Sequence, residues 1–315
     1  GEGEGDEETP ETFMGHARMC FVGSLKGHEG PVWGLAYAGN SLVVSGSSDG
    51  TVKLWSLKTM SCLYSFTGHE GNVHTVSVQN GRIFSGSADN TIKVWDINQK
   101  LCIATLRGHT AIASSLVISD KYVFSGSYTE IKVWDLKTYQ CVTTLKGHNH
   151  WVRALAIDRA PGGRLYSGSY NSISVWDLDK LECVKTVATP GGSVYCLLVS
   201  ENRLFSASYD RKIYVWDTKT MLCRKSMHGH LQTVYSLCVS GSLLYSGSYD
   251  QKIRVWSLDR LMCLQTLSKH QGSIDALLAV DDMPDYDNFI VSASADHSIY
   301  CWASSTKRVI TPHET

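Results

Sequence analysis

The stretch at residues 68–96 reads GHEGNVHTVSVQNGRIFSGSADNTIKVWD. It opens with a Gly-His pair, and short apolar runs follow, separated by the polar turns Asn80-Gly81 and Ala88-Asp89-Asn90. Apolar and polar residues that alternate over runs of this length, bounded by turn residues, predict short β-strands. The stretch ends at Trp95-Asp96, and the rest of the chain repeats this unit with variations.

The tryptophan that ends the unit recurs at steps of 40, 39, 42, 40, 40 and 46 residues, at Trp55, Trp95, Trp134, Trp176, Trp216, Trp256 and Trp302. A period near 40, with an early Gly-His pair, a turn aspartate and a closing Trp-Asp, resembles the WD-repeat family of four-stranded propeller blades. One small sheet cannot bury both faces, whereas stacked blades bury each face against the next. We therefore predict an all-β fold, a closed seven-bladed propeller built from repeats one to seven.

The segment at residues 19–28, MCFVGSLKGH, matches the last strand of the other repeats but has no earlier repeat to join. We expect it to pair with repeat seven and close the ring, which leaves no free sheet edge. The competing candidate is RVITP at residues 308–312. The placement of Cys20 at the repeat's cysteine position favours the N-terminal segment.

The WD-repeat resemblance also implies a hydrogen-bonded chain inside each blade. In repeat two its members would be His69, Asp89 and Trp95, and we predict Ser85 as the strand member. A His-Asp pair is also typical of catalytic sites, but one that recurs in repeat after repeat indicates structure. We expect no enzyme activity, catalytic residue, metal or cofactor in this chain.

Composition and charge limit the class of protein and the partners that it could bind. The 315 residues are 43% hydrophobic with a net charge of −1, and no apolar run reaches the length of a membrane helix. The six acids within residues 1–12 leave 24 acids against 29 Lys and Arg in the remainder, which is too weak a basic balance for nucleic-acid binding. We predict an acidic linker at 1–15, the propeller at 16–303 and a C-terminal tail at 304–315.

Ten cysteines are present, and six of them lie seven residues after a repeat tryptophan, on separate blades: Cys62, Cys102, Cys141, Cys183, Cys223 and Cys263. We interpret this as a repeated packing position whose thiols cannot readily pair. No close CxxC spacing suggests zinc. Unpaired cysteines in this number predict a reducing compartment, the cytoplasm and also the nucleus.

The irregular repeats carry a finer resemblance. The turns of repeats three and four read SGSYTEIKVW and SGSYNSISVW. Each is one residue shorter than SGSADNTIKVW of repeat two and lacks the turn aspartate. In repeat five, Thr189-Pro190 replaces the Gly-His pair. Together with NHWVRAL and KHQG, these features resemble the C-terminal propeller of the TNF receptor-associated factor family of RING-type E3 ubiquitin ligases. The resemblance implies a substrate- or scaffold-recruiting domain in MAP kinase kinase kinase signalling, preceded in the full protein by a RING finger and a coiled coil.

Partner binding is expected on one face of the ring, because Tyr, Trp and Arg dominate interface hot spots. The predicted protein-binding residues are Trp33, His74, Tyr128, Trp151, Arg153, Tyr170, Tyr195, Tyr209, Tyr235 and Tyr249. The alternative for each turn tyrosine is packing against the neighbouring blade. The alternative functions are a reader of phosphorylated or methylated peptides, and a scaffold unrelated to ubiquitin. We expect the isolated propeller to be monomeric, without nucleic-acid or membrane partners, and the full protein to oligomerise through the coiled coil.

Overall fold

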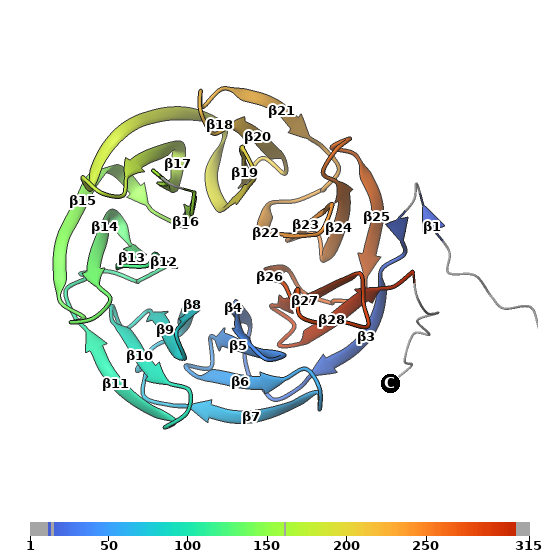
Figure 1. Cartoon of the computed structure of the whole chain (residues 1–315), viewed down its shortest axis with the longest axis horizontal. Helices are drawn as coiled ribbons and strands as arrows, with labels where there is room; N and C mark the ends of the chain where they lie inside the picture. The colour runs from blue at the N-terminus through green and yellow to red at the C-terminus, as the bar shows by residue number, and fades with distance from the viewer. Residues whose placement is uncertain (1–11, 14–15, 161, 307–315) are drawn as a thin grey trace, which may run out of the picture.

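The structure is a computed structural model, and it describes residues 12–13, 16–160 and 162–306. Every regular element in these residues is a β-strand. Figure 1 shows the strands arranged around a central axis, with the first strand of each repeat innermost and the last strand on the outer circumference. None of the described residues forms a helix that could span a membrane.

The strands form antiparallel sheets in chain order. The sheet of repeat one holds β4 (Val32–Gly39), β5 (Leu42–Ser47), β6 (Val52–Ser56) and β7 (Ser61–Phe66). The sheet of repeat two holds β8 (Val73–Gln79), β9 (Arg82–Ser87), β10 (Ile92–Asp96) and β11 (Leu101–Leu106). The sheet of repeat three holds β12 (Ser115–Ile118), β13 (Tyr122–Gly126), β14 (Tyr128–Asp135) and β15 (Cys141–Trp151).

Repeats four and five share one sheet of β16 (Ala154–Ile157), β17 (Arg164–Asp177), β18 (Glu182–Ser200), β19 (Arg203–Ser208), β20 (Ile213–Asp217) and β21 (Cys223–Met227). Repeat six forms β22 (Val234–Ser240), β23 (Leu243–Ser248), β24 (Lys252–Ser257) and β25 (Cys263–Ser268). Repeat seven forms β26 (Ile274–Ala279), β27 (Asn288–Ser294) and β28 (Ile299–Ser304), joined by β3 (Cys20–Leu25).

The prediction of a closed seven-bladed ring is wrong in its number of blades. Among the described residues the propeller strands form six sheets, because β18 runs for 19 residues without a break from repeat four into repeat five. The cause is local: Thr189-Pro190-Gly191-Gly192 replaces the Gly-His loop and stays within the strand, so β18 pairs with β17 along its first part and with β19 along its last. Two sequence repeats are thereby merged into one six-stranded sheet.

The N-terminal segment pairs as expected. β3 lies antiparallel to β28, with Leu25 opposite Ile299 and Cys20 opposite Ala303, and Figure 1 shows β3 on the outer side of β28. Met19, Phe21 and Leu25 are buried. A second short sheet pairs β1 (Thr12–Phe13) with β2 (His16–Ala17). The acidic residues 1–11 and the competing strand at 308–312 lie outside the described residues.

The core lies between neighbouring sheets, where apolar side chains of one repeat pack on the next. Val44 and Val52 of repeat one, for example, share a cluster with Val73, Val76 and Trp95 of repeat two. The sheets approach so closely that the middle glycine of each Ser-Gly-Ser strand is needed. A Cβ added to Gly46 would lie 2.6 Å from the Val73 side chain, and one at Gly168 would lie 2.6 Å from that of Val194.

The repeated cysteine position is not a packing position, contrary to our interpretation. Five of its six thiols are exposed, at Cys62, Cys102, Cys141, Cys183 and Cys223. They lie on the outermost strands, which have no neighbouring sheet on their outer side (Figure 1). All ten cysteines are free thiols, as predicted.

Candidate functional site

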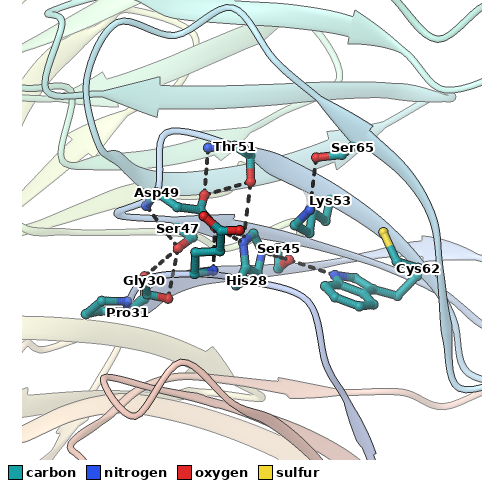
Figure 2. Close-up of polar contacts among 12 residues, drawn as sticks. His28, Gly30, Pro31, Ser45, Ser47, Asp49, Thr51, Lys53, Cys62 and Ser65 are labelled. Carbon is teal, nitrogen blue, oxygen red and sulfur yellow. Dashed lines mark hydrogen bonds and ion pairs between the residues drawn. The ribbon is translucent and has the colours of Figure 1, made fainter.

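A hydrogen-bonded chain joins the strands of each regular repeat, and Figure 2 shows it in repeat one. The Trp55 indole donates to Ser45 Oγ at 2.7 Å, and His28 Nε2 lies 2.7 Å from the same hydroxyl. His28 Nδ1 lies 2.7 Å from Asp49 Oδ2. Because a carboxylate only accepts, Nδ1 carries the proton and the Ser45 hydroxyl donates to Nε2. Each polar group is satisfied, so this chain holds the repeat together.

Repeat two has the same chain, and Ser85 is its strand member, which confirms that prediction. His69 lies 2.7 Å from Asp89 Oδ2 and 2.7 Å from Ser85 Oγ, to which Trp95 donates at 2.8 Å. Burial would raise the pKa of the Asp89 carboxyl, but hydrogen bonds from Thr91 and His69 lower it to about 2. Burial lowers the pKa of His69 despite Asp89. The pair is therefore a neutral imidazole that donates to a carboxylate.

Repeats three and four lack the turn aspartate, as the sequence shows, and they differ from each other. In repeat three Glu130 takes its place, with Oε1 3.1 Å from His109 Nδ1. In repeat four the one side-chain hydrogen bond of His148 within the described residues joins Nε2 to Ser167 Oγ at 2.6 Å. Burial lowers the pKa of His148 to about 4, so its ring is neutral at physiological pH.

Repeat five has no loop histidine, and its turn aspartate is bound differently. The Tyr214 hydroxyl donates to Asp210 Oδ2 at 2.5 Å, and Lys212 Nζ lies 3.6 Å from the same oxygen. Burial and this hydrogen bond raise the pKa of Tyr214. The Thr189 and Ser208 hydroxyls are buried without a hydrogen-bond partner among the described residues. Repeat five thus departs most from the regular pattern.

The predicted protein-binding residues of repeats three to six form one continuous cluster. The Arg153 guanidinium carbon lies 5.9 Å from the Trp151 ring centroid and 5.5 Å from that of Tyr195. Tyr195 meets Tyr235 edge to face at 5.0 Å, and Tyr235 meets Tyr249 at 6.2 Å. Arg153 itself is exposed. The cluster therefore presents an exposed cation within a row of rings.

The shortened turns of repeats three and four extend this row. Tyr128 pairs with Trp151 across β14 and β15, and their ring centroids lie 5.4 Å apart. His150 was missed from the sequence. Its ring centroid lies 6.2 Å from that of Tyr128 and 5.6 Å from that of Tyr170. We call this surface the aromatic face, made of Tyr128, His150, Trp151, Arg153, Tyr170, Tyr195, Tyr209, Tyr235 and Tyr249.

The turn tyrosines do not bury their rings against the neighbouring blade. Tyr128 is 49% exposed, and Tyr170, Tyr209 and Tyr249 are 55%, 63% and 58% exposed. Exposed aromatic rings grouped in this way are typical of interaction surfaces. The packing alternative is therefore disfavoured for these four residues.

Trp33 and His74 form a separate stacked pair, with ring centroids 4.6 Å apart. Burial and the charge of Arg153 lower the pKa of His74. Asp275 of repeat seven is also near the centre, where burial raises its pKa to about 7 and one carboxyl oxygen is buried without a partner among the described residues. His74 and Asp275 are therefore electrostatic neighbours of the aromatic face, through Arg153 and Tyr235 respectively.

A hollow of about 710 Å³ opens on the aromatic face above repeat five. Its lining comprises Tyr170, Gly191, Gly192, Tyr209, Asp210, Arg211, Gln232, Thr233, Tyr235 and Tyr249. Its volume is within the range of roughly 300 to 1,000 Å³ typical of ligand sites. No group of three or more potential metal ligands occurs in the part of the chain that the structure describes.

Comparison with known proteins agrees with this architecture. The WD40 family, described as "WD domain, G-beta repeat", matches residues 19–56, 60–96, 100–135, 139–177, 181–217, 221–257 and 261–303. The chain therefore belongs to the WD40 family. Seven repeats are thus carried on six hydrogen-bonded sheets, and the number of blades depends on which is counted.

Two curated relatives match over short stretches. Cell division control protein 4 of Saccharomyces cerevisiae is 41% identical over 58 residues, which are 18% of this chain and 7% of that protein. WD repeat-containing protein pop1 of Schizosaccharomyces pombe is 40% identical over 60 residues, 19% of this chain and 8% of that protein. The matched stretches thus span less than a tenth of either relative.

Among solved structures, the WD40 β-propeller domain of Doa1 has a TM-score of 0.82. The match covers 92% of this chain and 98% of that one, at 24% identity. Such a likeness establishes the fold. WD40 propellers are suited to protein–protein interaction and are typically non-catalytic, which agrees with the structural role of the His-Asp pairs.

Proposed function

We propose that this chain recruits a protein partner through the aromatic face, as the substrate- or scaffold-binding domain of a RING-type E3 ubiquitin ligase. The observation that carries the binding proposal is the exposed Arg153 guanidinium, which lies over Trp151 and Tyr195. Arg and aromatic residues supply most of the energy of protein interfaces, because they bury large areas and keep a hydrogen-bonding group. A cation already held against two rings loses little side-chain entropy on binding.

The ligase assignment rests on sequence. The shortened turns of repeats three and four, the loop of repeat five and the segments NHWVRAL and KHQG are similar to the propeller of the seventh TNF receptor-associated factor. By that similarity the partner is a MAP kinase kinase kinase or a substrate of the ligase. In this proposal ubiquitin transfer belongs to a RING part outside residues 1–315, and an upstream coiled coil oligomerises the whole protein.

The proposed compartment is the cytoplasm, and also the nucleus. Ten free thiols support it, five of them exposed, because exposed unpaired cysteines persist in reducing surroundings.

Affinity capture tests the proposal. The purified chain is immobilised, incubated with a cytoplasmic extract, and the retained proteins are identified by mass spectrometry. The proposal expects a MAP kinase kinase kinase that is retained by the parent and lost from a variant carrying Trp151→Ala and Arg153→Ala. Equal retention by parent and variant would refute the role of the aromatic face. Retention of unrelated partners through that face would refute the ligase assignment only.

A second candidate is a reader of modified peptides. Exposed Arg153 beside tyrosine side chains is a favourable environment for a phosphate group, because guanidinium groups bind phosphate with charge-assisted hydrogen bonds. A peptide array synthesised with and without phosphoserine, and with and without methyllysine, separates the candidates. Binding that disappears when the modification is removed would favour the reader.

A further inference from the structure

The hollow above repeat five exists because of the irregular loop. Gly191 and Gly192 both have positive φ, at 91° and 81°, and contribute no side chain to the lining. A Cβ added to Gly191 would lie 2.3 Å from Asp210 Cγ. Glycines are therefore favoured at both positions that follow Thr189-Pro190, the replacement of the Gly-His pair, and they leave space between the turn tyrosines.

Four of the ten residues that line the hollow are tyrosines. Tyr170, Tyr209 and Tyr249 come from the turns of three successive repeats and are each more than half exposed. Tyr235 adds a fourth ring, which stands at 89° to that of Tyr249. Each side chain combines a flat apolar face with one hydroxyl group.

The backbone beside the hollow is already hydrogen-bonded. The Tyr209 N–H donates to Ser193 O at 3.0 Å, the Asp210 N–H to Gly191 O at 3.1 Å and the Tyr249 N–H to Thr233 O at 2.9 Å. A ligand that adds as a β-strand needs free backbone groups at a sheet edge. These three N–H groups are occupied, which favours recognition through side chains over addition of a strand.

The charges of the hollow argue against a basic ligand. Asp210 is bound by the Tyr214 hydroxyl and by Lys212, so its carboxylate already has a cation. The Arg211 side chain has no hydrogen bond or ion pair with any residue that the structure describes, and it is exposed. The unpaired charge at the rim is therefore positive, which favours an acidic residue in the ligand.

We propose that this hollow binds a proline-rich segment of a partner in the polyproline II conformation, with an acidic residue placed against Arg211. Polyproline II chains have no internal hydrogen bonds, and proline has no N–H, so such a segment presents rings and carbonyl oxygens. Tyrosine rings pack on proline rings and tyrosine hydroxyls donate to carbonyls. Aromatic-lined grooves recognise proline-rich segments in this way. The inference rests on the proposed function, since it specifies what part of a protein partner the aromatic face holds.

Fluorescence anisotropy with purified chain tests it. The probe is a fluorescein-labelled peptide of five prolines followed by Asp, compared with the same peptide in which alanines replace the prolines. We expect the alanine peptide to bind at least about tenfold more weakly. Tyr209→Ala and Tyr249→Ala should each weaken the proline peptide about tenfold, and Tyr209→Phe severalfold. Leu101→Ala is the control, because Leu101 is an exposed apolar residue on the outer strand β11 and belongs neither to the hollow nor to the aromatic face. It should bind normally.

A second pair of measurements tests the acidic preference. Changing the Asp of the probe to Lys should weaken binding severalfold in the parent, and Arg211→Ala should abolish that difference. Tighter binding of a lysine-rich or phosphoserine probe than of the proline probe would overturn the inference, as would equal effects of Tyr209→Ala and Leu101→Ala. Circular dichroism and melting temperature confirm that each variant is folded. If the proline probe fails while Trp151→Ala with Arg153→Ala still abolishes partner capture, the inference falls and the proposed function stands.

Discussion

Glu130 Oε1 lies 3.1 Å from Nδ1 of His109, where an aspartate meets the loop histidine in repeats one, two, six and seven at 2.7 to 3.0 Å. The turn of repeat three is one residue shorter, and the longer glutamate side chain spans the extra distance. A different residue at a different position therefore preserves the same hydrogen bond to the ring.

This relationship predicts that Glu130→Ala destabilises the protein, because a buried His109 N–H loses its acceptor. Glu130 is 21% exposed and makes one hydrogen bond to the ring, so we expect a loss of about 1 kcal/mol in the free energy of unfolding. Glu130→Gln keeps an acceptor for the His109 N–H and should recover most of the lost free energy of unfolding. Urea denaturation measures the difference, and equal stability of Glu130→Ala and the parent would show that the contact is dispensable.

Asp89→Ala should cost more, about 1 to 3 kcal/mol. Asp89 accepts from the His69 ring, from the Thr91 N–H and hydroxyl, and from the Glu70 N–H. Removing it leaves several donors unpaired at once. Asp120→Ala is the control, because that side chain is fully exposed, and its melting temperature should match the parent. An unchanged melting temperature for Asp89→Ala would contradict the structural role of the hydrogen-bonded chain of Trp95, Ser85, His69 and Asp89.

Stability should fall on acidification in two pH ranges. Burial lowers the pKa of His28 and His69, and lowers those of His109 and His148 to about 4. Between about pH 6.5 and 4 the unfolded chain therefore binds more protons than the folded chain, and the free energy of unfolding decreases as pH falls. Despite the opposing effect of burial, hydrogen bonds lower the pKa of Asp49 and Asp89 to about 2, which adds a second loss between about pH 4 and 2.

Urea denaturation at pH 7, 5, 4 and 2.5 measures both losses. His148→Gln should reduce the slope between pH 7 and 5, because its ring has no carboxylate partner and titrates only in the unfolded chain. A midpoint that does not change from pH 7 to 5 would contradict the assignment of these rings as neutral.

The pairing of β3 with β28 predicts different outcomes for two N-terminal deletions. Removing residues 1–15 leaves β3 intact and should not change the melting temperature. Removing residues 1–27 deletes β3 with the buried Met19, Phe21 and Leu25, and exposes the edge of β28. The protein should then melt well below the parent or aggregate. If the longer deletion melts like the parent, β3 does not stabilise the sheet.

Much of the fold was predictable, because its signals are local and repeated. The tryptophan spacing located every repeat, and the WD-repeat resemblance led to the prediction of Ser85 as the strand member of the hydrogen-bonded chain. Glu130 was missed because the search was for an aspartate at the turn position. In repeat three a glutamate at a different turn position accepts the same hydrogen bond. The continuity of β18 was also missed, since Thr-Pro-Gly-Gly is typical of a loop, and β18 runs on because the residues on either side of this stretch pair with β17 and β19.

The candidate site was predictable to a similar extent. Repeat geometry placed the turn tyrosines and Trp151 on the same surface, and their ring contacts now join them. His150 and the hollow were missed. Neither follows from the repeat, because both depend on how the irregular turns of repeats three to five pack in three dimensions.

Partner binding by a variant of the aromatic face tests the central claim most directly. A partner recovered by capture is purified, and its Kd is measured by calorimetry against the parent and against Trp151→Ala with Arg153→Ala. The control is Leu222→Ala with Arg224→Ala. These two exposed residues are two positions apart, as Trp151 and Arg153 are; Leu222 directly precedes the outer strand β21, and Arg224 lies on it. We predict a loss of about thirtyfold or more for the first variant, at unchanged melting temperature, and a normal Kd for the control. Normal binding by the first variant and a loss in the control would contradict the account.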